Sequence, residues 1–483
     1  MLEFAIVGAG FGGLAMGLAL QRAGVGEFLV LEKADRVGGT WRENQYPGAA
    51  CDVPSHLYSL AQAPNAGWTR MFPQQPEIQA HLERSAAALV AAGRVCFGWQ
   101  LVEARWDAQQ GAWALLAGDG RQLWARHLVM ALGGLHVPAY AAIERRGVYA
   151  GVEFHSARWR HDVDLRGRRV VVIGTGASAI QLIPEIAAQG AQLTVLQRSA
   201  PWILPRPDFA IAPFWQAVLA RVPALRLALR GGIFLLLEVL SHGLLDRRLA
   251  GWARWLARRH REAQVADPAL RARLTPDYAI GCKRVLISSN YYPALQRPNV
   301  QLESTPAAAI EAGGVRLADG RLIEAEVLIH GTGFRPLDVL SGLRILGREG
   351  RELAVDWGPR PQAHLGIGVH GYPNLHFLLG PNTALGHNSV LYMIECQVRH
   401  ILALHAARRR RGALAVEPAL PAQQAFMAQV DRGFAASAWA DGCRSWYLDS
   451  AGHNIALWTR TCLAYRWRTR LDEGDYCWSL APD

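Results

Sequence analysis

Apolar residues along this chain occur in two patterns, short continuous runs and longer segments with helical spacing. Residues 4–7 and 28–31 are short apolar runs, and residues 13–22 between them have the helical spacing. This order predicts a parallel βαβ unit. Residues 169–198 repeat the order, with LTVL as the second apolar run, and predict a second unit.

The segments around these units predict the remaining parts of the fold. Residues 76–92 open with a proline and an acidic residue and predict a helix. Residues 95–130 alternate in three runs separated by AQQG and AGDG, which predicts an antiparallel β-meander. Residues 211–262 have helical spacing, and strand patterns return over 298–330. The predicted fold class is α/β, with two Rossmann-like dinucleotide-binding domains, a β-meander and a helical insert.

Each predicted unit has a glycine-rich turn between its first strand and its helix. The two turns are Gly8-x-Gly10-x-x-Gly13 and Gly174-x-Gly176-x-x-Ala179. The first glycine permits a tight turn, the second admits a pyrophosphate, and the third small residue lets helix and strand pack closely. The phosphates then lie at the positive end of the helix. In a chain with 48 glycines, the strand–turn–helix setting is what makes the motif specific.

The residues after the second strand of each unit predict which dinucleotide binds. Glu32 is placed to accept hydrogen bonds from ribose hydroxyls and would repel a 2′-phosphate. Arg198 and Ser199 offer charge and donors for that phosphate, although Arg198 as an ordinary solvated arginine is the alternative. We therefore expect FAD at the first turn and NADPH at the second, two redox cofactors that exchange a hydride.

The domain organisation follows from this assignment. We expect residues 1–148 to form the first part of an FAD-binding domain and residues 149–163 to be a connector. Residues 164–324 are expected to form an NADPH-binding domain, with the helical insert at about 205–275. Residues 325–483 are expected to complete the FAD-binding domain and to end in a C-terminal tail.

Charge and composition narrow the choice of partners. The net charge is +11, but the basic residues are dispersed and no nucleic-acid-binding motif is present, so we expect no nucleic-acid partner. Anionic dinucleotides account for part of the excess charge. Only two of the 51 basic residues are lysines, Lys33 and Lys283. A lysine in such a chain marks a candidate site for a compact ammonium group, or it stands there by chance.

Cysteine spacing and the apolar segments indicate where in the cell the protein is expected to be. The seven cysteines form no CxxC pair and no metal-ligand spacing, so we expect free thiols, no metal site and a cytoplasmic protein without a signal peptide. Charged residues such as Arg230 and Glu238 interrupt the insert, which excludes a membrane span. Buried packing helices and helices that lie on a bilayer surface both fit this pattern.

Three stretches resemble class B flavin-dependent monooxygenases of the Baeyer–Villiger type, relatives of the flavin-containing monooxygenases. Residues 39–52, GTWRENQYPGAACD, match a family pattern, and residues 281–293, GCKRVLISSNYYP, resemble the segment that supplies the family's active-site arginine. In residues 149–159, YAGVEFHSARW, the family fingerprint is matched at His155 and Trp159. Tyr149 replaces the usual phenylalanine of that fingerprint.

The resemblance implies roles for individual residues. Those expected along FAD, besides the first turn and Glu32, are Gly39, Thr40, Trp41, Asp52 and Tyr58. Those expected to hold NADPH are Gly174, Gly176, Ser178, Gln181, Arg198, Ser199 and Lys283, the lysine at the 2′-phosphate. Arg284 is expected to face the flavin as the catalytic residue, with Asp52 beside it. For His155 a positional role at a hinge is favoured over a catalytic base, and Trp159 is expected to anchor the connector.

The implied activity is an NADPH- and O2-dependent insertion of one oxygen next to a ketone carbonyl, through a C4a-peroxyflavin, to give an ester or lactone. The insert is rich in aliphatic and aromatic residues, which favours an apolar ketone. Two alternatives remain at this point. One is a monooxygenase that hydroxylates nitrogen or sulfur, and the other is a non-catalytic sensor of NADPH.

Overall fold

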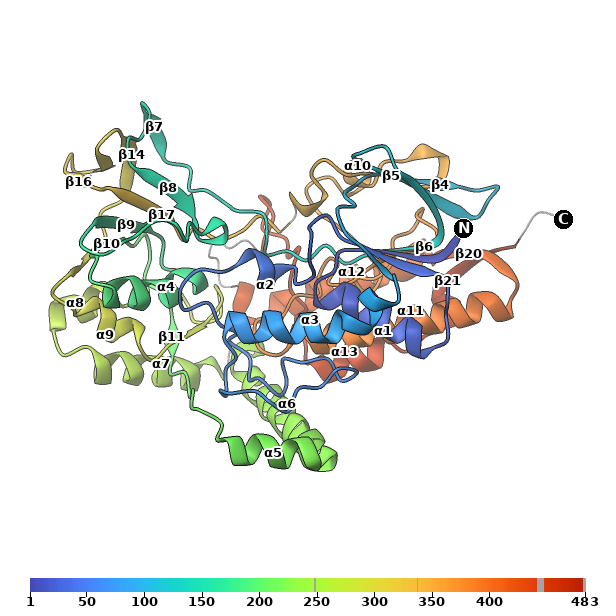
Figure 1. The fold of residues 1–483 in the computed structure, drawn as a ribbon, viewed down its shortest axis with the longest axis horizontal. Coiled ribbons are helices and arrows are strands. Elements are labelled where there is room, and N and C mark those ends of the chain that lie inside the picture. The colour runs from blue at the N-terminus through green and yellow to red at the C-terminus, as the bar shows by residue number, and fades with distance from the viewer. Residues whose placement is uncertain (247–248, 337, 441–446, 481–483) are drawn as a thin grey trace.

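The computed structural model describes residues 1–483 except 247–248, 337, 441–446 and 481–483. The chain forms two lobes joined by several crossing segments (Figure 1). The lobe that contains the N-terminus is built on a sheet with the strand order β18-β4-β5-β6-β1-β2-β3, in which β19 also pairs with β6. Its strands are β1 (Leu2–Val7), β2 (Phe28–Leu31), β3 (Val95–Cys96), β4 (Leu101–Asp107), β5 (Ala112–Ala117), β6 (Gln122–Met130), β18 (Arg344–Leu346) and β19 (Leu375–Phe377).

The first lobe confirms the predicted βαβ unit and the β-meander. Strand β1 pairs in parallel with both β2 and β6, whereas β4, β5 and β6 pair antiparallel in succession. Helices cover the sheet, and a separate two-stranded antiparallel sheet lies beside α11. These elements are α1 (Phe11–Arg22), α2 (Thr40–Glu43), α3 (Gln75–Ala91), α10 (Leu353–Trp357), α11 (Val390–Arg410), α12 (Leu420–Ala436), α13 (Cys462–Arg468), β20 (Ala413–Pro418) and β21 (Tyr476–Leu480).

The second lobe contains the second predicted βαβ unit in a fully parallel sheet with the order β13-β10-β9-β17-β8. A smaller sheet with the order β16-β15-β14-β7 lies beside it. The elements are β7 (Glu144–Arg146), β8 (Val152–His155), β9 (Arg169–Ile173), α4 (Ala177–Ala188), β10 (Gln192–Leu196), α9 (Tyr291–Leu295), β13 (Val300–Glu303), β14 (Ala307–Glu311), β15 (Gly314–Leu317), β16 (Leu322–Glu324) and β17 (Val327–His330).

The chain enters the second lobe before residue 149, earlier than we expected. Strand β7, within the predicted range 1–148, pairs with β14 of the second lobe. Strand β8, within the predicted connector, is the edge strand beside β17. The sequence of β7 is ERR, which has no apolar pattern, so only its pairing in the folded protein reveals it as a strand.

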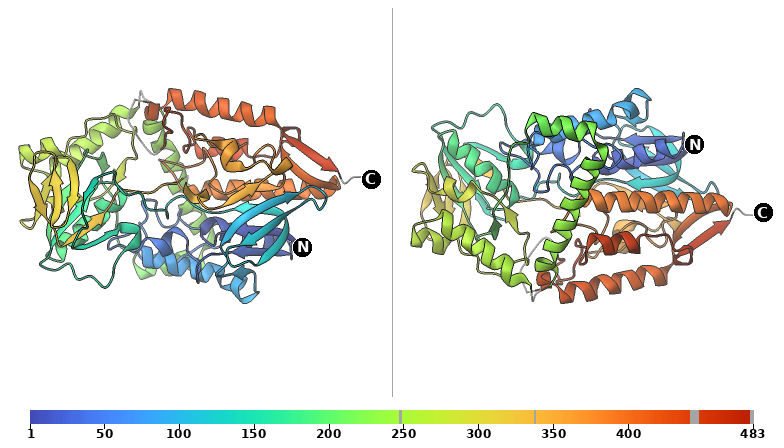
Figure 2. Two further views of the ribbon diagram at one scale, coloured as in Figure 1. Left: turned by 90° about the horizontal axis from the view of Figure 1, so that it is seen from above. Right: turned by 90° about the horizontal axis from the view of Figure 1, so that it is seen from below.

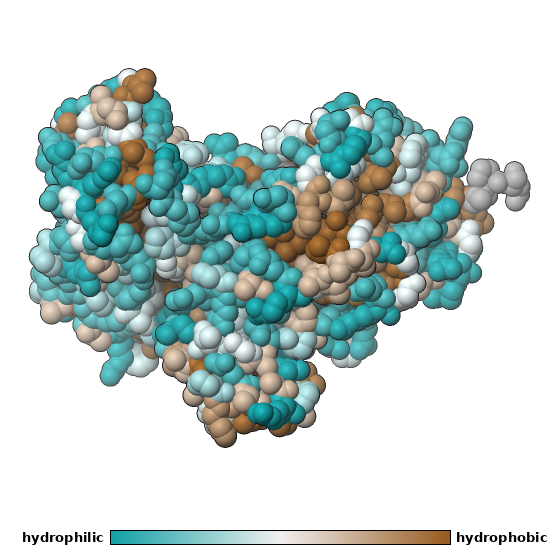
Figure 3. Space-filling view, viewed as in Figure 1, coloured by the Kyte–Doolittle hydropathy of each residue, from teal (hydrophilic) through white to brown (hydrophobic). Residues whose placement is uncertain are grey.

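The helical insert connects the two lobes on one side of the molecule (Figure 2). It begins at β11 (Ile203–Leu204), which pairs with β12 (Leu286–Ile287), and contains α5 (Pro213–Arg221), α6 (Pro223–Leu245), α7 (Ala250–Gln264) and α8 (Pro268–Arg273). Helix α6 packs on the first lobe, where Phe234 stacks on Tyr392 of α11 with ring centres 4.5 Å apart. Helix α7 packs on the second lobe through Ala253 and Ala257. On the projecting end that carries α5 and α6, apolar and polar residues lie side by side (Figure 3).

The helices agree with the expectation of no membrane span, whereas the cysteines depart from expectation at one position. Among the helices in the described part of the chain, none has the length and apolarity needed to cross a bilayer. Five cysteines are free thiols, whereas Cys282 is disulfide-bonded, so the expectation of free thiols was wrong for Cys282. Sequence spacing did not predict this disulfide, because the two cysteines of a disulfide must be close in space but need not be close in the sequence. Cys443 lies outside the described residues.

Gly174 gives a test of the second glycine turn. Its φ is +107°, and a Cβ atom at this position would lie 2.5 Å from the carbonyl oxygen of Gly331. We expect Gly174→Ala to lower the free energy of unfolding by about 1–3 kcal/mol, from strain and the backbone clash. Gly231→Ala is the control, because a Cβ in α6 meets no atom within 4 Å there and favours the helix. Urea denaturation of both variants measures the difference, and equal losses would contradict the close approach.

Candidate active site

The first glycine turn has a tightly closed backbone that fits a dinucleotide phosphate. Gly8 has φ +106°, and a Cβ atom there would lie 2.5 Å from the carbonyl oxygen of Ala131. The turn opens α1, whose N-terminus faces the position of a bound phosphate in such folds. Gly10 approaches Gly39 so closely that a Cβ on Gly39 would lie 3.0 Å from the Gly10 Cα atom. The predicted turn and the start of the segment 39–52 are therefore adjacent in space.

Glu32 follows β2 and is buried beneath this turn. Its carboxylate accepts hydrogen bonds from the backbone N–H of Ala9 at 2.8 Å and of Ala34 at 3.0 Å. It also pairs with the guanidinium of Arg42 at 3.0 Å. Glu32 thus fixes the glycine turn from below, and its carboxylate retains lone pairs for a ribose hydroxyl. Sequence reasoning missed Arg42, although it lies within a matched family segment.

The predicted FAD residues after Gly39 form one cluster in the first lobe. Thr40 and Trp41 begin α2, and the Trp41 indole donates to the hydroxyl oxygen of Tyr58 at 3.0 Å. The ring of Tyr58 also meets Phe11 of α1 edge-on, with ring centres 5.2 Å apart. Burial raises the pKa of Tyr58 well above its ordinary value. The Tyr58 hydroxyl is therefore a neutral hydrogen-bonding group.

The second glycine turn repeats the geometry of the first. Gly174 and Gly8 share nearly the same φ, and each lies against a backbone carbonyl from a neighbouring strand end. Ala179 stands where the first turn has its third glycine. Gly331 makes room for the Ala179 methyl group, since a Cβ on Gly331 would lie 3.0 Å from the Ala179 Cβ. The third position therefore still allows close packing of helix and strand.

The structure brings together three residues predicted at the 2′-phosphate. Arg198 and Ser199 follow β10, and Lys283 comes from a segment 84 residues away to donate to the Ser199 hydroxyl at 3.0 Å. The Lys283 ammonium also lies 4.3 Å from the ring centre of Tyr278. Burial lowers the pKa of Lys283, and the charge of Arg198 lowers it further. A bound phosphate dianion would relieve the repulsion between the two cations.

Two other residues predicted at NADPH lie where α4 meets the first lobe. Ser178 is in the first turn of α4, and Gln181 follows one turn later. The Gln181 amide accepts from the Tyr46 hydroxyl at 2.9 Å and donates to the carbonyl oxygen of Ala50 at 3.0 Å. Gln181 therefore ties the two lobes together, a contact that the sequence did not indicate.

Arg284 and Asp52 form an ion pair between the lobes. Asp52 belongs to the first lobe, Arg284 precedes β12, and the guanidinium nitrogen lies 2.5 Å from the carboxylate oxygen. The side chains are 34% and 33% exposed, so the pair faces an open space. The charge of Asp52 raises the pKa of Arg284 further above its ordinary value. Arg284 is therefore a permanent cation.

Tyr447 is the residue beside this pair that sequence reasoning missed. Its ring is buried, and burial raises the pKa of its hydroxyl while the charge of Arg284 lowers it. Tyr447 lies 163 positions from Arg284 in the chain, so sequence spacing does not place the two side by side. Only the folded arrangement could reveal it.

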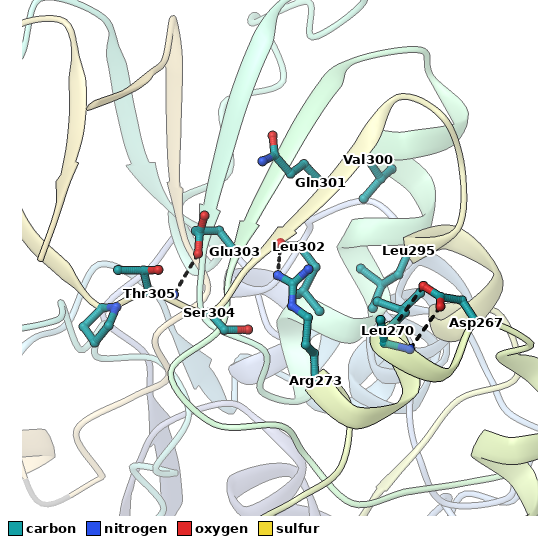
Figure 4. A pocket seen from close by; sticks show the side chains of 12 residues that line it. Asp267, Leu270, Arg273, Leu295, Val300, Gln301, Leu302, Glu303, Ser304 and Thr305 are labelled. Carbon is teal, nitrogen blue, oxygen red and sulfur yellow. Dashed lines mark hydrogen bonds between the residues drawn. The ribbon is translucent and has the colours of Figure 1, made fainter. Parts of the chain in front are cut away.

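Two cavities accompany these residues. A cavity of about 190 Å³ lies between the lobes, where Gly48 and Gln181 face Arg206 and Ser288. A larger one, of about 830 Å³, lies beside β13 and α8 (Figure 4). Of its polar side chains, Glu303 accepts from the backbone N–H of Thr305 at 2.8 Å, and Asp267 accepts from the backbone N–H of Ala269 at 3.0 Å. The ion pair of Arg284 and Asp52 is not among the residues that line the larger cavity.

Two groups of side chains have the composition of a metal site. They are Glu3 with His127 and His405, and Glu238 with His387 and Cys462. Arg408 binds Glu3 at 2.5 Å, and Asn388 binds Glu238 at 2.8 Å. Both carboxylates are thus already neutralised or hydrogen-bonded within the protein.

His155 and Trp159 lie in the second lobe, at the end of β8 and just after it. His155 ends β8 and is fully buried, and its Nδ1 accepts from the backbone N–H of Ala157 at 3.0 Å. Burial lowers the pKa of His155 to about 4, so the ring is neutral at pH 7. Trp159 packs edge-on against Phe154 with ring centres 5.1 Å apart. This placement fits the predicted positional roles, which stay predictions.

Comparison with known proteins places this geometry in a family. The chain is 42% identical to a Baeyer–Villiger monooxygenase of Pseudomonas aeruginosa, over 97% of this chain and 89% of that relative. The chain belongs to the Baeyer–Villiger monooxygenase family. A second Baeyer–Villiger monooxygenase, from Streptomyces coelicolor, is 40% identical over 98% of the chain and 92% of the relative. Family models match an NAD(P)-binding Rossmann-like domain at residues 6–74 and a flavin-binding monooxygenase-like domain at residues 107–229.

Solved structures agree with this Baeyer–Villiger assignment. An oxidized steroid monooxygenase bound to NADP has a TM-score of 0.88 and 30% identity, with 99% of both chains covered. A closed form of cyclohexanone monooxygenase has a TM-score of 0.88 and 25% identity over the same share. The protein is thus an FAD-dependent, NADPH-using monooxygenase that acts on a ketone with O2. Its two glycine turns fit the phosphates of these cofactors, because each leaves no room for a side chain at its first glycine.

His155 makes a testable contribution to the pH dependence of stability. Its pKa is about 4 in the folded protein and about 6.5 when unfolded, so the unfolded chain binds more protons between these values. The free energy of unfolding therefore falls as the pH drops from about 6.5 to about 4, by at most about 1.4 kcal/mol per unit from this residue. We expect His155→Asn to make that decline shallower in urea denaturation at several pH values.

The control for this test is a histidine on the surface. His161 is exposed, so His161→Asn is expected to leave the pH profile unchanged. Buried His376 and His400 also have lowered pKa values and keep part of the decline in every variant. An unchanged slope in His155→Asn would contradict the neutral, buried state of the ring.

Proposed function

We propose that Arg284 and Asp52 form the catalytic centre of this monooxygenase and that its substrate is an apolar ketone. The observation that carries the proposal is the 2.5 Å ion pair, which joins an arginine before β12 to a carboxylate of the first lobe. FAD on the first glycine turn and NADPH on the second would approach this pair from opposite sides. When bound, NADPH supplies a hydride to FAD, and the reduced flavin activates O2.

Arg284 supplies a fixed positive charge for the oxygen-transfer chemistry. Attack on a ketone carbonyl places negative charge on oxygen, and a preorganised guanidinium stabilises that charge most strongly where water is scarce. The raised pKa of Arg284 means that it gives no proton to the anion. Its planar group has donors for Asp52 and for a reacting oxygen at the same time.

Asp52 holds Arg284 in position. A single carboxylate opposite the guanidinium fixes its orientation and keeps part of its charge available to the substrate. The segment that carries Asp52 is anchored on both sides: Ala50 by Gln181 and Ser55 by the carbonyl oxygen of Met71 at 3.0 Å. The position of Asp52 therefore depends on backbone contacts rather than on the ion pair alone.

A buried apolar cluster next to Arg284 supports the substrate class. Tyr447 lies beside Arg284 and belongs to a buried cluster with Trp439 and Leu457, against which Leu245 of α6 packs. A carbonyl group directed at Arg284 would leave the hydrocarbon part of a ketone against this cluster. Cyclohexanone, in the name of one structural relative, is an apolar ketone of this kind.

NADPH selectivity is assigned to Arg198, Ser199 and Lys283. We expect Arg198→Ala to raise the KM for NADPH by roughly ten- to a hundredfold, because one charged hydrogen bond to the 2′-phosphate is lost. The KM for NADH, which lacks that phosphate, is expected to stay nearly unchanged. Steady-state kinetics with both cofactors measures the split. Equal damage to both would contradict the assignment.

Arg284→Ala tests the catalytic centre. The two glycine turns are unchanged in this variant, so we expect it to bind FAD and to oxidise NADPH. Ester formation is expected to fall by about 10²–10³, the usual effect of removing one preorganised donor, with hydrogen peroxide released instead. Product analysis with a ketone, together with a peroxide assay, measures both outcomes.

Arg284→Lys is the matched variant, because it keeps the positive charge but loses the planar guanidinium group. A compact ammonium cannot bind Asp52 and a reacting oxygen with the geometry of the planar guanidinium, so we expect only partial recovery. Near-normal ester formation in Arg284→Ala would show that another residue stabilises the developing charge. It would remove the central residue from the proposal.

A further inference from the structure

Helix α6 buries one charged residue among its inward apolar side chains and carries a second apolar stripe on its outward side. Its inward side includes Glu238, which is 4% exposed. The Glu238 carboxylate accepts from Asn388 Nδ2 at 2.8 Å and from the backbone N–H groups of Cys462 and Leu463 at 3.1 Å. Its outward side carries Leu235, Leu236 and Val239, each more than half exposed. Surface helices of globular proteins normally turn such an apolar stripe toward the core.

The neighbouring helices α5 and α7 also expose aromatic residues. Phe214 and Trp215 of α5 are more than half exposed, and so is Trp255 of α7. Trp252 of α7 lies against Gly243 of α6, where an added Cβ would be 2.5 Å from its indole nitrogen. We call this surface the insert face. Its exposed residues are Phe214, Trp215, Leu235, Leu236, Val239, Leu240, Trp252 and Trp255.

Arginines accompany the insert face. Arg221, Arg254, Arg258 and Arg259 are exposed on α5 and α7. Arg259 lies over the Trp255 ring, 5.7 Å from its centre, so cation and indole occur together. The exposed acidic residue of α7, Glu262, is already paired with Arg258 at 2.7 Å. The insert face therefore combines apolar and indole groups with an excess of positive charge.

We propose that the insert face docks on an anionic lipid bilayer. Aliphatic residues at the centre, tryptophans beside them and arginines around them are the composition of helices that lie in the bilayer interface. The charge excess complements acidic headgroups. No described helix is suited to span the bilayer, so the contact lies on the membrane surface. Figure 2, in the view from below, shows α5 and α6 on the outside of the molecule.

The test is vesicle cosedimentation of the FAD-loaded protein, without NADPH or ketone, so that it does not depend on the proposed function. We expect binding to vesicles that contain phosphatidylglycerol and roughly tenfold weaker binding to pure phosphatidylcholine or in about 0.5 M salt. Leu236→Glu with Val239→Glu is expected to weaken binding at least about tenfold. Val355→Glu is the control, because Val355 is an exposed helical valine, 75% accessible, on α10 of the first lobe.

Three outcomes would overturn the proposal. Equal loss in the control and the double variant would show that added charge, rather than the insert face, weakens binding. Equal binding to neutral vesicles would exclude the anionic partner. A dimer in sedimentation velocity that becomes monomeric in the double variant, with no vesicle binding, would assign the insert face to a second copy. Should the double variant lose FAD, Trp215→Ala on the separate helix α5 tests the same surface, with the same expected loss of binding.

Discussion

The ion pair between Arg284 and Asp52 joins the two lobes, and contacts from both lobes hold its two side chains in place. A pair that is one-third exposed contributes little to stability, so its importance lies in where it holds the guanidinium. Asp52 is placed by a segment bound to both lobes, and Arg284 by the short pairing of β12 with β11. A charge held from two sides keeps its direction without rearranging, as the catalytic role that we propose for Arg284 requires.

The glycine turns of the two lobes have the same backbone conformation, but the charged residues near them differ. Gly8 and Gly174 share the same conformation, which fixes the phosphates but does not distinguish one dinucleotide from another. The residues after the next strand differ: a buried carboxylate at Glu32 in the first lobe, and in the second lobe the cations Arg198 and Lys283, which we propose select NADPH. Because Lys283 and Arg284 are neighbours in the chain, one segment positions both the proposed 2′-phosphate site and the proposed catalytic cation.

Local patterns made most of the fold and part of the site predictable. The glycine turns, the β-meander and Arg198 lie within short stretches whose hydrophobic period and turn residues carry the information. The side-by-side placement of Lys283 and Ser199 was expected only through the family resemblance. Tyr447 beside Arg284 could not be predicted, nor could the pairing of β7 with β14, because each depends on segments that are distant in the chain.

The insert shows the limit of periodicity most clearly. The sequence of α6 allowed both a buried packing helix and a surface helix, since a helical period does not tell which side faces the protein. The buried carboxylate of Glu238 determines which side faces the protein, because three hydrogen-bond donors of the first lobe bind it. Leaving that carboxylate buried without donors would destabilise the fold far more than exposing a leucine does. Leu235, Leu236 and Val239 then point outward, whereas Phe234 packs against the first lobe. Leu245, at the end of the same helix, packs in the cluster of Tyr447. The helix that exposes this apolar surface therefore also packs against the side chains next to Arg284.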